Sequence, residues 1–69
     1  MKIKYSESED ILLLEISSEK IDYAEEDGPL IIHYSERHKP VLIEILDASN
    51  VLSSILKSEL QAKNKMLIK

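Results

Sequence analysis

The stretch of this chain that most restricts its fold is Lys39–Ser49, which reads Lys-Pro-Val-Leu-Ile-Glu-Ile-Leu-Asp-Ala-Ser. Its β-branched and aliphatic residues favour an extended strand. Asp47 and Ser49 then offer side chains that can cap the first free N–H groups of a helix. Apolar residues follow at helical spacing, namely Val51, Leu52, Ile55, Leu56 and Leu60. The junction therefore predicts a sheet that leads into one C-terminal helix over about residues 48–62, with a tail over residues 63–69.

Shorter strand-like stretches precede this junction and are separated by polar turns. They lie around Ile3 and Tyr5, over Ile11–Ile16, over Ile21–Glu26 and over Leu30–Tyr34. Asp27-Gly28-Pro29 is the clearest turn, and Pro40 begins the last strand, where a missing N–H is tolerated. Because short connections place successive strands side by side, we expect an α+β fold. It consists of an antiparallel β-meander of four to five strands over about residues 2–46, with the helix packed on one face. Residues 1–69 form a single domain.

Several of these strands carry apolar residues on both faces. Strand side chains alternate, so one face is predicted to meet the helix through Leu12, Leu14, Ile16, Val41, Ile43 and Ile45. One helix covers only one face, which leaves an apolar patch on the other side. This patch consists of Ile11, Leu13, Ile31, Leu42 and Leu46. Exposed apolar patches mark interfaces, so we expect a homodimer or a complex with another protein. Two alternatives stay open: a face assignment that is shifted by one residue, or a tail that covers the patch.

The size and composition of the chain fit this expectation. Its 69 residues lie near the lower limit for a self-sufficient core, and it has no cysteine for disulfides or cysteine-based zinc sites. Association with a partner is then a remaining source of stability. No apolar run approaches the roughly 20 residues that span a bilayer, and none is long enough for a signal-peptide core. We therefore expect a soluble cytoplasmic protein with no membrane partner.

Charge is distributed unevenly along the chain. The net charge is −4, but residues 1–27 carry nine acids against three lysines, a net of −6. Residues 57–69 carry four lysines and one glutamate, a net of +3. Solvated faces and a basic helix end account for this pattern. The alternative is an acidic surface that steers a basic partner.

No combination of residues points clearly to chemistry. A hairpin around residues 35–39 brings His33 near Leu42 or Glu44, and His38 would complete a conceivable metal site. The spacing matches no metal motif, so two surface histidines are the favoured interpretation. One glycine cannot build a phosphate-binding loop, and the carboxylates cluster only in turns. Three tyrosines in an acidic sheet region do not suit nucleic acid. We expect no enzymatic activity, no cofactor, no small-molecule substrate and no nucleic-acid partner.

Several segments together resemble a known family. They are Met1-Lys2-Ile3-Lys4-Tyr5, the acidic turn with Asp10, the strand Leu12–Ile16, and Ile43-Glu44-Ile45-Leu46-Asp47-Ala48-Ser49. In this order they resemble the small prokaryotic domain-of-unknown-function family 2283 over most of residues 1–52. Family members usually have Asp-Ala-Leu-Tyr-like residues where this chain has Asp10-Ile11-Leu12-Leu13, and they tend to carry aspartate in place of His33.

The resemblance implies a fold and a prokaryotic, intracellular setting, but no activity and no catalytic residues. Genes of this family sometimes neighbour small toxin-like genes. The resemblance therefore suggests an alternative function, in which the protein is the antitoxin-like partner of a small basic toxin or ribonuclease.

Overall fold

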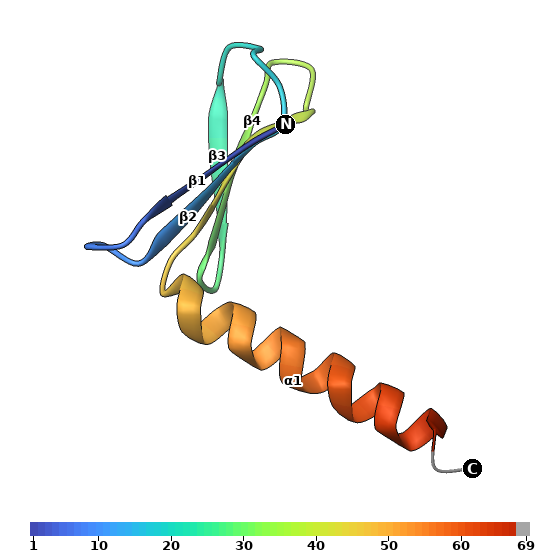
Figure 1. The fold of residues 1–69 in the computed structure, drawn as a ribbon. Helices are drawn as coiled ribbons and strands as arrows, with labels where there is room; N and C mark the ends of the chain where they lie inside the picture. The colour runs from blue at the N-terminus through green and yellow to red at the C-terminus, as the bar shows by residue number, and fades with distance from the viewer. Residues whose placement is uncertain (68–69) are drawn as a thin grey trace.

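The computed structural model of the protein contains one five-stranded sheet followed by one helix (Figure 1). It describes the backbone of residues 1–67 and the side chains of residues 1–61. The elements are β1 (Lys2–Ser6), β2 (Ile11–Glu15), β3 (Tyr23–Asp27), β4 (Leu30–Tyr34), β5 (Pro40–Ile45) and α1 (Ala48–Leu67). All neighbouring strands are antiparallel. The predicted α+β class, with an antiparallel sheet and one C-terminal helix, is confirmed.

The order of the strands differs from the predicted meander. Across the sheet they run β1-β2-β5-β4-β3, so that β5 lies in the centre and β3 at an edge. Successive strands are neighbours only where a tight turn joins them. The connection between β2 and β3 covers residues 16–22, and it leads from the second strand of the sheet to the opposite edge. This long connection leaves the side of β2 free for β5, which contains the buried residues Val41 and Ile45.

The register gathers apolar side chains on one face, because directly opposite residues in neighbouring strands point to the same side. One row contains Tyr5, Leu12, Ile45 and Leu30, and a second contains Ile3, Leu14, Ile43 and Ile32. A third contains Ile16, Val41, Tyr34 and Tyr23, although a register shift between His33 and Tyr34 places Pro40 rather than Val41 directly opposite Tyr34. We call these three rows the apolar face. It includes all six residues that the alternation assigned to a common face, so this assignment is confirmed.

The opposite face mixes apolar and charged residues. One of its rows contains Lys4, Leu13, Glu44, Ile31 and Glu26, and the other contains Lys2, Glu15, Leu42, His33 and Ala24. We call this the mixed face. Lys4 and Glu15 form an ion pair here, with 3.7 Å between Nζ and Oε1. Both side chains are well exposed, and such a pair contributes little to stability.

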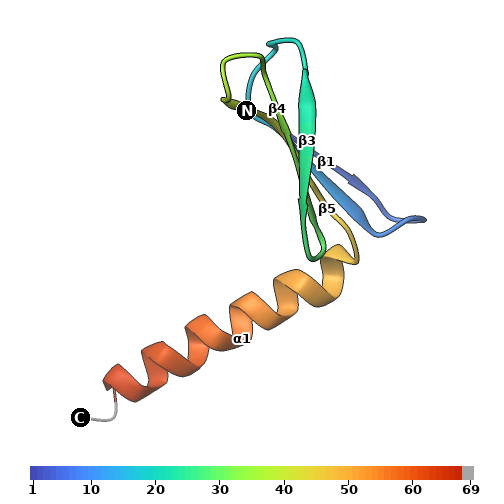
Figure 2. The ribbon, with the colours of Figure 1, turned by 180° about the vertical axis from the view of Figure 1, so that it is seen from behind.

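The helix covers neither face of the sheet. In two opposite views, α1 begins at the end of the sheet next to the β1–β2 turn and runs away from it (Figure 1, Figure 2). The prediction that the helix packs on one face is therefore wrong for the single chain. The local reason is the turn before α1, where Asp47 has a left-handed backbone with φ of 52° and turns the chain outward.

The helix is also longer than predicted. It continues to Leu67, beyond the expected end near residue 62 and through most of the expected tail. Residues 63–67 contain two lysines, methionine, leucine and one asparagine, but neither glycine nor proline, so most of them have a helix propensity that favours continuation. Met66 and Leu67 of the expected tail therefore belong to the helix. Ile68 lies outside the described residues.

This arrangement leaves the chain with a very small core. Among the side chains described, the buried apolar ones are Val41, Ile45 and Ala48. The radius of gyration is 15.1 Å, whereas a compact chain of this length has a value of about 11 Å. Several large apolar side chains at the edge of the sheet and along α1 are thus well exposed, among them Ile3, Tyr5, Ile55 and Leu56.

Candidate interaction surface

The apolar face offers a large surface for contact with another protein. At its β1 edge, Ile3 is 66% exposed and Tyr5 is 52% exposed. Towards the middle of the sheet, Leu14, Ile32 and Ile43 are half-buried between their strand neighbours, and α1 does not cover them (Figure 1). Glu25 and Asp27 of β3 continue two of the rows and form an acidic border. The chemistry of such a surface is desolvation of aliphatic and aromatic side chains rather than catalysis.

Asp10 fixes the start of α1 to the β1–β2 turn. The Tyr5 hydroxyl donates a hydrogen bond of 2.6 Å to Oδ1 of Asp10. The N–H and Oγ of Ser49 donate to Oδ1 and Oδ2 over 3.1 and 2.7 Å. The Ala48 N–H donates to the Asp10 carbonyl over 2.9 Å. The bond from Tyr5 is the main cause that lowers the pKa of Asp10, with a further contribution from Ser49, and the same bond raises the pKa of Tyr5.

The two histidines lie apart from each other. On the mixed face, Nε2 of His33 lies 2.6 Å from Oε1 of Glu44, in a partly buried pair. This confirms the predicted cross-strand neighbours of His33. His38 instead contacts Tyr23 on the apolar face, with 2.8 Å between Nδ1 and the hydroxyl oxygen. Burial is the main cause that raises the pKa of Tyr23, and Glu25 adds to it.

The metal hypothesis therefore lacks its third ligand. The structure brings together His33 and Glu44 but not His38, which hydrogen-bonds to a residue of the other face. Within the described part of the chain, no group of three histidine, aspartate, glutamate or cysteine residues could hold a metal ion.

The patch predicted from sequence lies mainly on the mixed face. Ile11, Leu13, Ile31 and Leu42 all point to that side, while Leu46 follows β5 and donates its N–H to the Pro29 carbonyl over 2.8 Å. Leu13 and Ile31 are the direct cross-strand partners of Glu44, so a carboxylate interrupts the patch. The assignment of the interface to these five residues stays a prediction.

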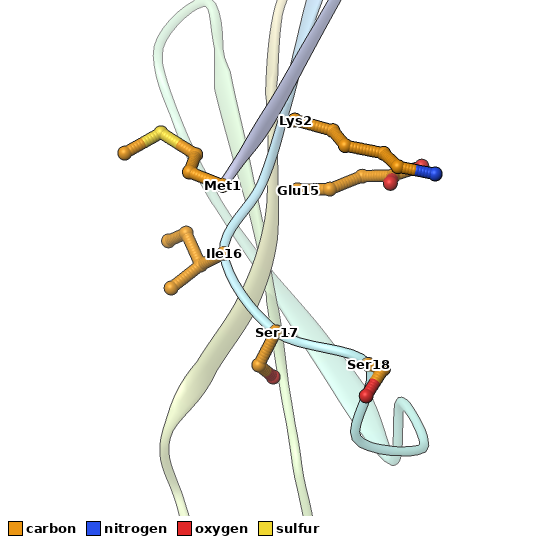
Figure 3. Close-up of a pocket in the computed structure, with 6 residues that line it drawn as sticks. All are labelled: Met1, Lys2, Glu15, Ile16, Ser17 and Ser18. Atoms are coloured by element: carbon orange, nitrogen blue, oxygen red, sulfur yellow. The ribbon is translucent and has the colours of Figure 1, made fainter.

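A surface depression of about 280 Å³ lies where β2 ends, lined by Met1, Lys2, Glu15, Ile16, Ser17 and Ser18 (Figure 3). The side chains of Lys2 and Glu15 extend to one side of the sheet, whereas Met1 and Ile16 extend to the other (Figure 3). The depression thus wraps around the sheet rather than enclosing a volume, and its polar groups do not converge on a common point.

Comparison with known families adds one result. The chain matches the family described as "Protein of unknown function (DUF2283)" over residues 2–49. The chain belongs to this family. The match covers all five strands and the first two residues of α1, so the DUF2283 unit includes the contact between Asp10 and Ser49. No curated protein and no solved structure matches the chain.

The remainder of α1 lies beyond the matched part of this DUF2283 chain. Within the described residues, no helix combines the length and the apolar character that are needed to cross a membrane.

Proposed function

We propose that this DUF2283 protein is an interaction module that functions as a homodimer, with the apolar face at the interface. One observation carries this proposal. Three rows of apolar side chains cross the sheet, α1 runs away from them (Figure 1), and Ile3, Tyr5 and Ile16 at their ends are well exposed in a single chain. A sheet with one apolar face needs a second layer against that face.

The free energy of burying this apolar surface supports association at micromolar concentration. Fully burying a large aliphatic or aromatic side chain stabilises by about 1.5–3 kcal/mol. About a quarter of this value over about ten side chains in each of the two copies is roughly 10 kcal/mol, whereas a micromolar dissociation constant corresponds to about 8 kcal/mol. The loss of translational and rotational freedom on association reduces the first figure. We therefore expect a dimer that forms at micromolar concentration rather than an extremely tight complex.

A second copy of the chain suits this face better than an unrelated partner. The centre of the face has no charged group that would need a matching charge, since Glu25 and Asp27 lie at the border. A surface of this kind is self-complementary, and twofold dimers are the commonest closed assemblies.

Two adjacent residues of β2 provide a matched test of the interface. Leu14 points to the apolar face and Leu13 to the mixed face, and both are half-buried. In sedimentation velocity at micromolar concentration, we expect the unmodified protein and Leu13→Glu to be dimers and Leu14→Glu to be a monomer. The opposite result for the two variants would move the interface to the mixed face. A monomeric unmodified protein at every concentration would contradict the proposal.

A second candidate function is binding to a basic protein, such as a small toxin-like ribonuclease. It is favoured by exposed acids along the edge strand β3, namely Glu25, Glu26 and Asp27, and by Glu7 and Glu9 in the β1–β2 turn. Complementary charge accelerates association, particularly at low salt.

The test of this second function uses the purified product of a neighbouring gene if that product is basic. Reversing Glu25 and Glu26 to lysine should slow association, whereas the control Glu36→Lys should not. A neighbour that does not bind removes this candidate.

A further inference from the structure

The chain contains two apolar surfaces that lack a partner. One is the apolar face, and the other is the stripe of α1 formed by Val51, Leu52, Ile55, Leu56 and Leu60. Within this stripe, Ile55 is 53% exposed and Leu56 is 62% exposed. An amphipathic helix normally lays such a stripe against a core. In a single chain the two surfaces do not meet (Figure 1, Figure 2).

The geometry at the start of α1 keeps the helix away from its own sheet. Ala48 is buried, and its N–H donates to the Asp10 carbonyl. Ser49 donates twice to the carboxylate of the same residue. A helix that folded back over its own apolar face would have to break these hydrogen bonds and change the left-handed backbone of Asp47. The helix is therefore held pointing away from its own sheet (Figure 1, Figure 2).

We propose that α1 of each copy packs across the apolar face of the other copy's sheet, so that the two chains exchange helices. This inference rests on the homodimer proposed above and adds which element fills its interface. Reciprocal exchange has twofold symmetry and closes the assembly. It converts two open sheets into two sheets that are each covered by a helix.

The dimensions of the two surfaces agree. At 1.5 Å per residue, the stripe from Val51 to Leu60 is about 14 Å long. A strand of five residues is about 17 Å long. The stripe thus extends along most of one strand length of the partner's apolar face.

The charges of the two ends of the chain are complementary as well. Residues 57–69 carry a net charge of +3, whereas residues 1–27 carry −6. Exchange brings α1 of each chain, which belongs to the basic part of the sequence, to the acidic strands and turns of the other chain. Parallel pairing of two α1 helices would instead bring like charges together, which is unfavourable.

The other symmetric arrangements leave apolar surface uncovered. If the two apolar faces packed against each other, both α1 stripes would remain in water. If the two helices packed against each other, both apolar faces would remain in water. Helix exchange is the arrangement that covers both surfaces with residues of the same two chains.

Mixing two variants tests the exchange directly. Leu56→Glu disables the helix surface and Leu14→Glu disables the sheet surface. A dimer of either variant alone contains two damaged helix–sheet contacts, and a buried unpaired charge should weaken it at least about tenfold. In a mixed dimer, both substitutions fall in the same contact and the other contact is unmodified. We therefore expect the mixture to dimerise where each variant alone is a monomer.

Controls keep this result interpretable. Ser53→Glu places the same charge on the polar side of α1 and should leave association unchanged. If Leu14→Glu fails to fold, as checked by circular dichroism, Ile3→Glu replaces it, because Ile3 is 66% exposed in the single chain. If the unmodified protein is a dimer and mixing gives no gain, the exchange is overturned while the homodimer remains. If the unmodified protein is a monomer, both proposals fall.

A spin label identifies the contact independently. The chain has no cysteine, so Ser54→Cys places one label on the polar side of α1. The spin-labelled chain is mixed with the unmodified, cysteine-free chain enriched in ¹⁵N. Only the ¹⁵N-enriched chain is then observed by NMR. Exchange predicts that the signals of Leu14, Ile32 and Ile43 broaden. Broadening confined to α1 of the observed chain, or no broadening in a proven dimer, would overturn the exchange.

Discussion

Asp10 joins the β1–β2 turn, the edge strand and the helix through one side chain. Tyr5 and Ser49 both donate to its carboxylate, and these bonds favour the ionised form. Its backbone is left-handed, with φ of 54°, a conformation that aspartate and asparagine adopt more readily than other side-chain-bearing residues. Asparagine at this position therefore keeps the backbone but removes the charge.

The lowered pKa of Asp10 predicts a pH dependence of stability. Because its pKa in the folded chain lies below the ordinary value of 3.8, the ionised carboxylate stabilises the fold above that value. This contribution is lost as the pH falls through the folded-state pKa. Between about pH 5 and about pH 2, the melting temperature should fall more steeply with decreasing pH for the unmodified protein than for Asp10→Asn. Asp47→Asn, also at a left-handed residue, is the control. Parallel curves for Asp10→Asn and the unmodified protein would contradict the prediction.

Gly28 predicts a purely conformational effect. It lies in the β3–β4 turn with φ of +58°, and a Cβ added there would meet no atom within 4 Å. Gly28→Ala should therefore lower the free energy of unfolding by about 1 kcal/mol through backbone strain alone. Gly28→Asn should cost less, because asparagine tolerates this conformation. Urea denaturation at one fixed protein concentration measures both values. Equal stability of all three proteins would show that the turn is not left-handed in solution.

At the scale of elements, local patterns were sufficient for some features and not for others. Alternation within β2 and β5 assigns Leu12, Leu14, Ile43 and Ile45 to one face, since it depends only on neighbouring residues. The Asp27-Gly28-Pro29 turn predicts the β3–β4 hairpin for the same reason. The pairing of β2 with β5 joins distant segments and has no local signal. The contact between Asp10 and Ser49 spans 39 positions and was likewise not foreseen.

The stability of α1 should depend on association. Its first turn contains no acidic residue, and its apolar stripe is exposed in the single chain. Helices of this length owe most of their stability to packing rather than to intrinsic propensity. Far-ultraviolet circular dichroism should therefore show less helix when the dimer is diluted into monomers. Leu14→Glu should have less helix than Leu13→Glu at the same concentration. Full helicity in a proven monomer would contradict this expectation.

At the scale of the whole molecule, the single chain is elongated, with principal extents of 48 × 30 × 22 Å. The amphipathic pattern of α1 correctly predicts a helix, and its apolar stripe suits contact with a sheet. The pattern carries no information about which chain supplies that sheet, because a stripe packs equally well on its own sheet and on another. Like the pairing of β2 with β5, the placement of the helix is therefore a part of the fold that sequence patterns do not determine.

The shape of the dimer distinguishes exchange from other assemblies. A compact body of twice 69 residues has a radius of gyration of about 14 Å, which is no larger than the 15.1 Å of the single chain. Small-angle scattering of the exchanged dimer should thus show twice the mass with almost no increase in the radius of gyration. Dimers joined only through their helices would give a value well above that of the single chain. The monomeric variant Leu14→Glu provides the reference measurement.

The central position of β5 also sets the order in which the sheet can be completed. During synthesis, β1 with β2 and β3 with β4 can each form a hairpin, but the two hairpins share no edge in the sheet. An isolated hairpin is only marginally stable in water. The last strand to leave the ribosome is the one that joins them, so the nascent chain has no complete sheet until residue 45 has emerged. Two short hairpins with unpaired edges are therefore the first species that chaperones can bind and that can aggregate.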